Sequence, residues 1–181
     1  MTLTDIANIA LESLSERAIS SIDDEGDDLA VRLKRNIFHS ISEVERSHHW
    51  TCLCKTEKLV RQGTLPTGER LFIKPSDFAG IIESYPNTSW RLEGKNIVAP
   101  LDDLCILYTR KSFNPDDWDE YLRGAVISRF RADIALNVSG DSKIAQLAYQ
   151  QAQIEIPRYI RNDIYGRRNR HLPQTHIFDG W

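Results

Sequence analysis

Two histidines and two cysteines in one short stretch are the first side chains whose types could do chemistry. His48, His49, Cys52 and Cys54 offer the imidazole and thiolate ligands that zinc favours. Their spacing is not that of a standard zinc site, and Cys105 stands alone further along the chain. In a strand, Cys52 and Cys54 would point to the same face, as two small core residues do. The pattern therefore favours buried thiols, and we expect no metal and no cofactor.

The residue types of nucleophilic and phosphate chemistry are present without the motifs that activate them. The sequence has no Gly-x-Ser-x-Gly turn, and neither Lys55 nor Lys58 follows a glycine-rich phosphate loop. Glycoside hydrolysis needs only two facing carboxylates, and a chain with 26 acidic residues can offer such a pair. We expect a protein that is not an enzyme, and a tail-associated cell-wall hydrolase stays open as one alternative.

The two ends of the sequence carry opposite charge. Residues 1–30 contain eight acidic residues and one basic residue, whereas the chain from Arg158 onward contains five basic and two acidic residues. The basic stretch also carries Tyr159 and Tyr165, so it could contact nucleic-acid phosphates. Arginine and aromatic side chains are also favoured anchors in protein interfaces. We prefer a protein partner and keep a DNA-binding protein as an alternative.

Four helices are expected to position these groups, because apolar residues recur every three or four positions in four segments. Thr4 is the expected cap of the first helix, and the second runs from about Asp27 to Arg46. In the third, Asn114 is the expected cap and Gly140 the stop. The fourth starts at residue 141 or 142 and is expected to kink or end at Pro157. The side chains expected to be buried are Leu33, Ile37, Ile41, Leu122, Val126, Phe130, Ile134 and Leu147.

The middle of the chain has the short apolar runs of strands. Runs at 50–56, 71–75 and 104–108 are separated by turn residues, and residues 90–99 predict a hairpin that turns near Gly94 to Asn96. We therefore expect an α+β, mainly helical fold: a four-helix bundle with a small antiparallel β-sheet inserted between helices 2 and 3. The expected domain is 1–165, with its β insertion at about 50–111.

The last segment, 166–181, is expected to be an extended C-terminal tail. It has no helical or alternating period, and Pro173 and Gly180 disfavour regular structure. The alternative is that its aromatic residues fold back on the body of the subunit. The side chains that could anchor it to a partner are Arg167, Arg168, Arg170, His171, Ile177, Phe178 and Trp181.

Composition sets the remaining limits. Hydrophobic residues make up 41% and charged residues 27% of the 181 residues, which suits one soluble domain. No apolar run approaches the roughly 20 residues of a membrane span. The first residues lack the pattern of a signal peptide, and the odd number of cysteines argues against a disulfide framework. We expect a protein that starts in the cytoplasm and does not enter a membrane.

The order of these segments resembles the tail tubular protein A family, the head-to-tail adaptors of short-tailed phages. The resemblance covers most of the chain, and the tail after Gly166 lies outside it. Ser15 departs from the family, many of whose members have a glycine there. The segments that carry the resemblance are Ile9-Ala10-Leu11-Glu12-Ser13-Leu14, Ile19-Ser20-Ser21-Ile22-Asp23-Asp24, Val44-Glu45-Arg46-Ser47-His48-His49-Trp50, Lys74-Pro75-Ser76-Asp77-Phe78, Trp90-Arg91-Leu92-Glu93-Gly94-Lys95-Asn96-Ile97 and the helices at 118–138 and 141–162.

The resemblance implies a virion component of the phage neck, made in the host cytoplasm. Adaptors of this family form a homo-dodecameric ring between the portal protein and a tail nozzle or tube protein. The genome leaves through the ring, so DNA would pass the lumen without sequence-specific binding. A ring requires heterologous contacts that close by rotation. On this reading, residues 166–181 form a docking arm for the portal.

Overall fold

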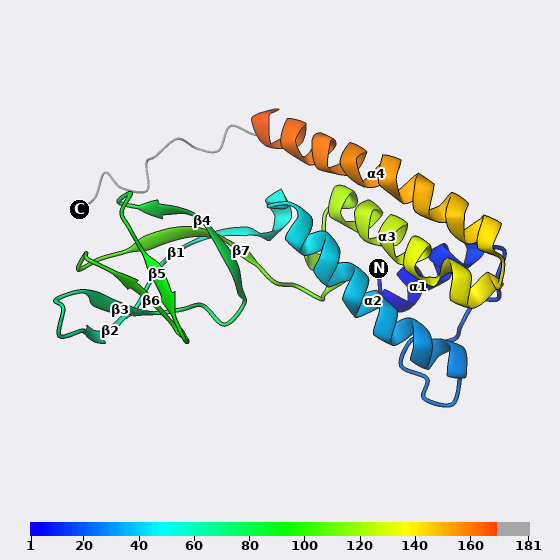
Figure 1. Cartoon of the computed structure of the whole chain (residues 1–181), viewed down its shortest axis with the longest axis horizontal. Helices are drawn as coiled ribbons and strands as arrows, with labels where there is room; N and C mark the ends of the chain where they lie inside the picture. Colours follow the sequence, from blue (N-terminus) through cyan, green and yellow to red (C-terminus); the bar gives the residue numbers. More distant parts are fainter. Residues whose placement is uncertain (170–181) are drawn as a thin grey trace. The chain divides into compact units, whose positions relative to one another are not determined.

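The chain folds into two compact units. The computed structural model describes the backbone of residues 1–169 and the side chains of residues 1–166. Met1–Cys52 and residues 113–169 form a helical unit, and Leu53–Ser112 form a β unit (Figure 1). The expected α+β class is confirmed, whereas the expected four-helix bundle with one inserted sheet is wrong.

The helical unit is built around one central helix. Its long elements are α1 (Leu3–Ser13), α2 (Asp28–Ser47), α3 (Glu120–Ser139) and α4 (Ser142–Asn169). The helices α1, α2 and α4 each make their main helix contacts with α3, rather than enclosing a shared core (Figure 1). The arrangement is not a bundle because α1 has only 11 residues and α4 covers a single face of α3.

Local capping decides where the helices begin. Thr2 caps α1 in a reciprocal capping box with Asp5, two residues before the expected Thr4. Asp27 caps α2 through its hydrogen bond from the backbone N–H of Leu29. Asn114 caps only the short 3₁₀ helix Pro115–Asp117, and Asp119 caps α3 itself. Gly140 ends α3 in the left-handed conformation (φ 66°), as the sequence predicts.

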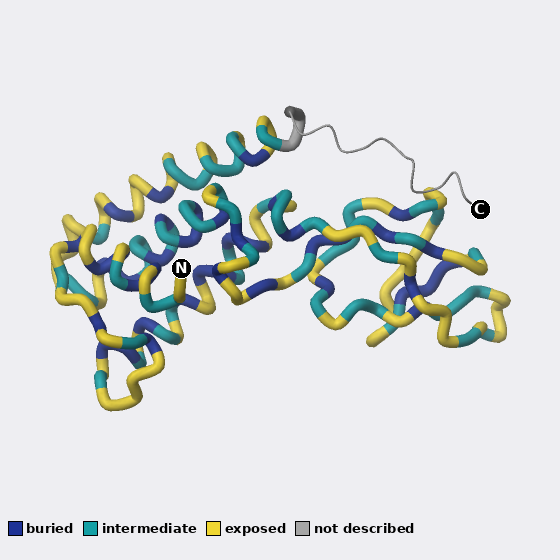
Figure 2. Tube along the Cα trace, turned by 180° about the vertical axis from the view of Figure 1, so that it is seen from behind, coloured by how far each residue is buried: buried dark blue, intermediate teal, exposed yellow. Residues whose placement is uncertain are grey.

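Most of the expected helical core is confirmed. Seven of the eight side chains are at most 1% exposed; they are Leu33, Ile37, Ile41, Leu122, Val126, Phe130 and Ile134. The eighth, Leu147, is 59% exposed, so its expected burial is wrong. The positions of α4 that face α3 are instead the small residues Ala148 and Ala152. Figure 2 shows the buried positions of α4 as isolated patches along a largely exposed helix.

The β unit contains two small antiparallel sheets, where one was expected. The first has the order β1-β7-β4, and the second has the order β2-β3-β6-β5. The hairpin between β5 and β6 is confirmed, and Gly94 in its turn has φ 59°. Strands β2 and β4 were not expected. The bounds are β1 Cys54–Lys58, β2 Arg61–Thr64, β3 Arg70–Ile73, β4 Phe78–Tyr85, β5 Arg91–Glu93, β6 Asn96–Ala99 and β7 Cys105–Arg110.

The core of the β unit joins residues of both sheets. Phe72 and Ile97 come from the second sheet, and Ile106 and Tyr108 come from the first. The Tyr108 hydroxyl lies 3.0 Å from Asp77 Oδ1 and 3.1 Å from Glu57 Oε2. Burial and the neighbouring Asp77 carboxylate raise the pKa of Tyr108 to about 12, so the hydroxyl keeps its proton and donates to these acids.

The fully buried Phe130 tests the central position of α3. Phe130→Ala should lower the free energy of unfolding by about 3–5 kcal/mol, because it leaves a cavity at a fully buried position. Leu136→Ala on the same helix is the matched control, since Leu136 is 54% exposed and should cost less than about 1 kcal/mol. Urea unfolding of both variants measures the difference. Equal losses would mean that α3 is not the centre of this unit.

Candidate functional site

The residues expected to form a docking arm lie at and beyond the end of α4. Gly166 is followed by a further helical stretch that contains Arg167 and Arg168, and α4 ends at Asn169. The side chains of Arg167 and Arg168, and all of Arg170, His171, Ile177, Phe178 and Trp181, lie outside the described residues. An end of the helix at Pro157 is not observed, because α4 continues through Pro157 to Asn169.

Several large apolar side chains of α4 are exposed among its polar ones. Leu147, Ile154 and Tyr165 are 59%, 72% and 55% exposed, and Ile144 and Ile164 are exposed as well. Ala148 and Ala152 are the buried positions of the first half of α4, whereas Ile144, Leu147 and Ile154 of the same half are exposed to solvent. Clustered exposed apolar groups of this kind mark surfaces that another molecule covers.

One glycine lets α4 approach α3 closely beyond Pro157. The ring of Tyr159 lies over Gly124, so closely that a Cβ at Gly124 would come within 2.5 Å of two ring carbons. No real Cβ tolerates such a contact. Gly124 therefore has a packing role in the middle of α3, where glycine is otherwise unfavourable.

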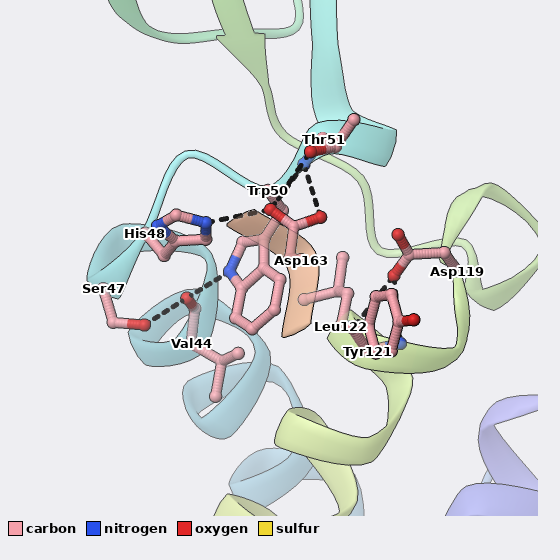
Figure 3. A network of polar contacts seen from close by, with 9 residues as sticks. All are labelled: Val44, Ser47, His48, Trp50, Thr51, Asp119, Tyr121, Leu122 and Asp163. Carbon is pink, nitrogen blue, oxygen red and sulfur yellow. Dashed lines mark hydrogen bonds and ion pairs between the residues drawn. The ribbon is translucent and has the colours of Figure 1, made fainter. Parts of the chain in front are cut away.

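A buried carboxylate holds the next turn of α4. Asp163 is 2% exposed and accepts hydrogen bonds from Thr51. The backbone N–H of Thr51 is 3.2 Å from Asp163 Oδ1, and the Thr51 hydroxyl is 3.1 Å from Oδ2. His48 Nε2 lies 2.9 Å from the same Oδ2 (Figure 3). A carboxylate only accepts, so Nε2 of His48 carries the proton in this contact.

The residues around His48 and Thr51 form a rigid corner at the end of α2. Trp50 is fully buried, and its indole N–H donates to the backbone carbonyl of Val44 at 2.8 Å (Figure 3). The ring of His48 meets the Trp50 ring edge-on, with centroids 5.2 Å apart. We call His48, Trp50 and Thr51 the corner. It presents three hydrogen-bond donors to one carboxylate of α4: the His48 ring, and the backbone N–H and hydroxyl of Thr51.

The electrostatics of this contact favour the ionised carboxylate. Burial alone would raise the pKa of Asp163, but the hydrogen bonds from His48 and Thr51 outweigh it and hold the pKa below the usual range. Burial raises the pKa of the nearby Cys52 thiol to about 12, and the carboxylates of Asp119 and Asp163 act in the same direction. Cys52 is therefore protonated at neutral pH and is poorly suited to bind a metal or to act as a nucleophile.

The four residues first considered for zinc have other surroundings. His48 is engaged with Asp163, and Cys52 lies in the 3₁₀ helix Thr51–Leu53 rather than in a strand with Cys54. Within residues 1–166, no three side chains of His, Cys, Asp or Glu gather as a metal site would require. No helix of the described chain is long and apolar enough to span a bilayer.

Searches against known proteins add no identification. No protein-family model and no curated protein matches this chain. The surface of α4 and its contact with the corner are therefore the features from which a function can be inferred.

The contact between Asp163 and the corner was not expected from the sequence. His48 and Asp163 are 115 residues apart, and no motif links them. One signal was present: Ala148, Ala152, Tyr159 and Asp163 recur at intervals of about four or seven residues, which places them on one helix face. An acidic residue on the face that packs inward indicates a buried partner.

Two glycine substitutions test the close approach at Tyr159. Gly124→Ala should destabilise the protein, because the new methyl group collides with the Tyr159 ring. Gly166→Ala is the matched control: its Cβ would meet Tyr121 at an ordinary 3.7 Å, and alanine favours a helix by up to about 1 kcal/mol. Chemical unfolding monitored by circular dichroism should show that Gly124→Ala lowers the free energy of unfolding and that Gly166→Ala raises it. Stabilisation by both substitutions would contradict the described packing.

The buried carboxylate predicts a specific response to acid. The pKa of Asp163 is lowered in the folded protein, so its contribution to stability is complete above the ordinary range of aspartate and is lost as pH falls toward the folded value. The stability difference between the wild type and Asp163→Asn should therefore shrink with falling pH. A carboxyl-carbon NMR titration of Asp163 with a midpoint at or above the ordinary range would contradict this assignment.

Proposed function

We propose that this protein is a structural virion component, a head-to-tail adaptor whose copies form a ring between a phage portal and a tail nozzle or tube. The observation that carries the proposal is the apolar outward face of α4, with Leu147 and Ile154 more than half exposed. An isolated subunit gains nothing from placing such side chains in water. A subunit that is covered by a neighbour gains their burial on assembly.

A neighbouring copy is the partner that this face fits best in a ring. A ring needs two different surfaces on each subunit, because one surface of each copy binds the other surface of the next copy. The face of α4 supplies the first, because it lies away from α3 and the rest of the helical unit. The number of copies, twelve, comes from the resemblance to the adaptor family and from the symmetry of its portal.

The C-terminal end is proposed as the attachment to the portal. Arg167 and Arg168 follow the last anchored turn of α4, and the sequence beyond them supplies His171 and the large apolar residues Ile177, Phe178 and Trp181. Arginine and aromatic residues are common anchors at interfaces. The chain has a slightly negative net charge of −3, which suits a ring through which DNA passes without being held.

A mass measurement of the complex with the portal tests the function. The purified chain mixed with its portal should give a discrete complex with twelve copies of the chain, observed by native mass spectrometry. Another copy number would refute the twelvefold ring. Failure to bind the portal, or sequence-specific binding of duplex DNA instead, would refute the adaptor function itself.

Two variants separate the two proposed contacts. Leu147→Ser combined with Ile154→Ser should leave the subunit folded but lower the number of copies on each portal, because the contact between copies loses its apolar side chains. Leu136→Ser, an exposed substitution on α3, is the control. Deletion of residues 167–181 should leave the melting temperature near that of the wild type and abolish attachment. Normal attachment of the deleted chain would refute the docking arm.

A further inference from the structure

Pro157 makes the middle of α4 its weakest point. A proline inside a helix lacks the backbone N–H that would bond to the carbonyl four residues earlier, here that of Gln153, and its ring crowds that carbonyl. Pro157 itself is exposed, so no packing against α3 compensates for this loss. The helix is continuous through Pro157. We call the part that follows it, residues 158–169, the arm.

The arm is held to the helical unit at few points. Among its described side chains, Asp163 alone is buried. Tyr159 rests on Gly124 and is partly exposed, while Arg158, Arg161, Ile164 and Tyr165 are exposed. Asp163 accepts from three donors of the corner, the His48 ring and the backbone and side chain of Thr51. The contact with the corner is therefore the main polar tether of the arm.

We propose that residues 158–169 form a hinged arm, with Pro157 as the hinge and Asp163 as the latch that closes it on the corner. Opening breaks the hydrogen bonds of Asp163 with His48 and Thr51 and leaves the segment before Pro157 packed on α3. The arm leads directly into the proposed docking residues. The role of the latch in assembly rests on the proposed adaptor function: docking to the portal opens the latch.

The arrangement of the latch favours a switch between two states rather than a gradual motion. An ionised carboxylate that leaves its three donors must reach water to be solvated, because a buried unpaired charge is unfavourable. A partial displacement of the arm would leave both Asp163 and the partly buried N–H of Thr51 poorly paired. The arm is therefore either closed on the corner or fully released.

Hydrogen exchange on the whole chain tests the hinge and the latch without any portal. A released helix of about twelve residues is marginally stable in water, so its amides exchange quickly. In Asp163→Ala, amides of residues 158–166 should exchange at least about tenfold faster than in the wild type, a factor expected from the loss of hydrogen bonds to a charged group. Amides of α3 and of residues 145–156 should be unchanged. Arg161→Ala, an exposed substitution two residues away, is the control and should have no effect.

A second substitution distinguishes a hinge from a simple structural contact. Pro157→Ala restores the N–H that bonds to the Gln153 carbonyl, so the arm becomes continuous with the rest of α4. Added to Asp163→Ala, it should return the exchange of residues 158–166 most of the way toward the wild-type rate. Faster exchange throughout the helical unit, no change in exchange, or no rescue by Pro157→Ala would each overturn the proposal.

The milder Thr51→Val covers the case in which Asp163→Ala fails to fold. It removes only the hydroxyl donor of the latch and should accelerate exchange of the same residues by a smaller factor. The link to docking is tested separately, by the rate at which each variant attaches to the portal. The Asp163→Ala chain should attach faster than the wild type, because the latch no longer has to open. An unchanged attachment rate would mean that opening of the latch plays no part in docking. If the wild type does not bind the portal at all, the adaptor function is refuted, and the hydrogen-exchange result still tests the hinge.

Discussion

The contact between α3 and α4 is the constraint on which the rest of the helical unit depends. Along its first half, α4 meets α3 with alanines, and its large apolar side chains face outward. Small residues bury little apolar area, so the burial that holds this half is modest. Along its second half, the helix is held by one ring over a glycine and by one buried carboxylate. A helix that is fixed in this way remains available to a partner.

This division of α4 explains why its sequence pattern is misleading. Leu147 has helical spacing and was expected to be buried, but in the structure it is exposed, as are Ile144 and Ile154 on the same helix. Periodicity identifies an apolar stripe and does not say whether the chain's own core or another molecule covers it. In α2 and α3 the apolar stripe is buried in the chain's own core, because both helices lie within the helical unit. For α4 the stripe and the core differ, because it is an outer helix.

Other differences from the sequence-based expectations also have local causes. Asn114-Pro115 is a sound helix start, but it begins a separate 3₁₀ turn, and Asp119 supplies the second cap that starts α3. Strand β4 contains Gly80 and two register irregularities, so it lacks the strict alternation by which a strand is recognised. The latch joins residues 48 and 163, and a contact between segments so far apart is set by the fold as a whole.

The structure thus combines a largely buried α3 with an outer helix α4 that exposes Leu147 and Ile154. These features support the proposed adaptor function and do not depend on any catalytic group. The most direct test is an electron-microscopy structure of the chain assembled on its portal. The account predicts that a neighbouring copy covers Leu147 and Ile154 in a closed twelvefold ring, with the chain beyond Pro157 in contact with the portal. A complex in which this face of α4 remains in solvent would contradict it.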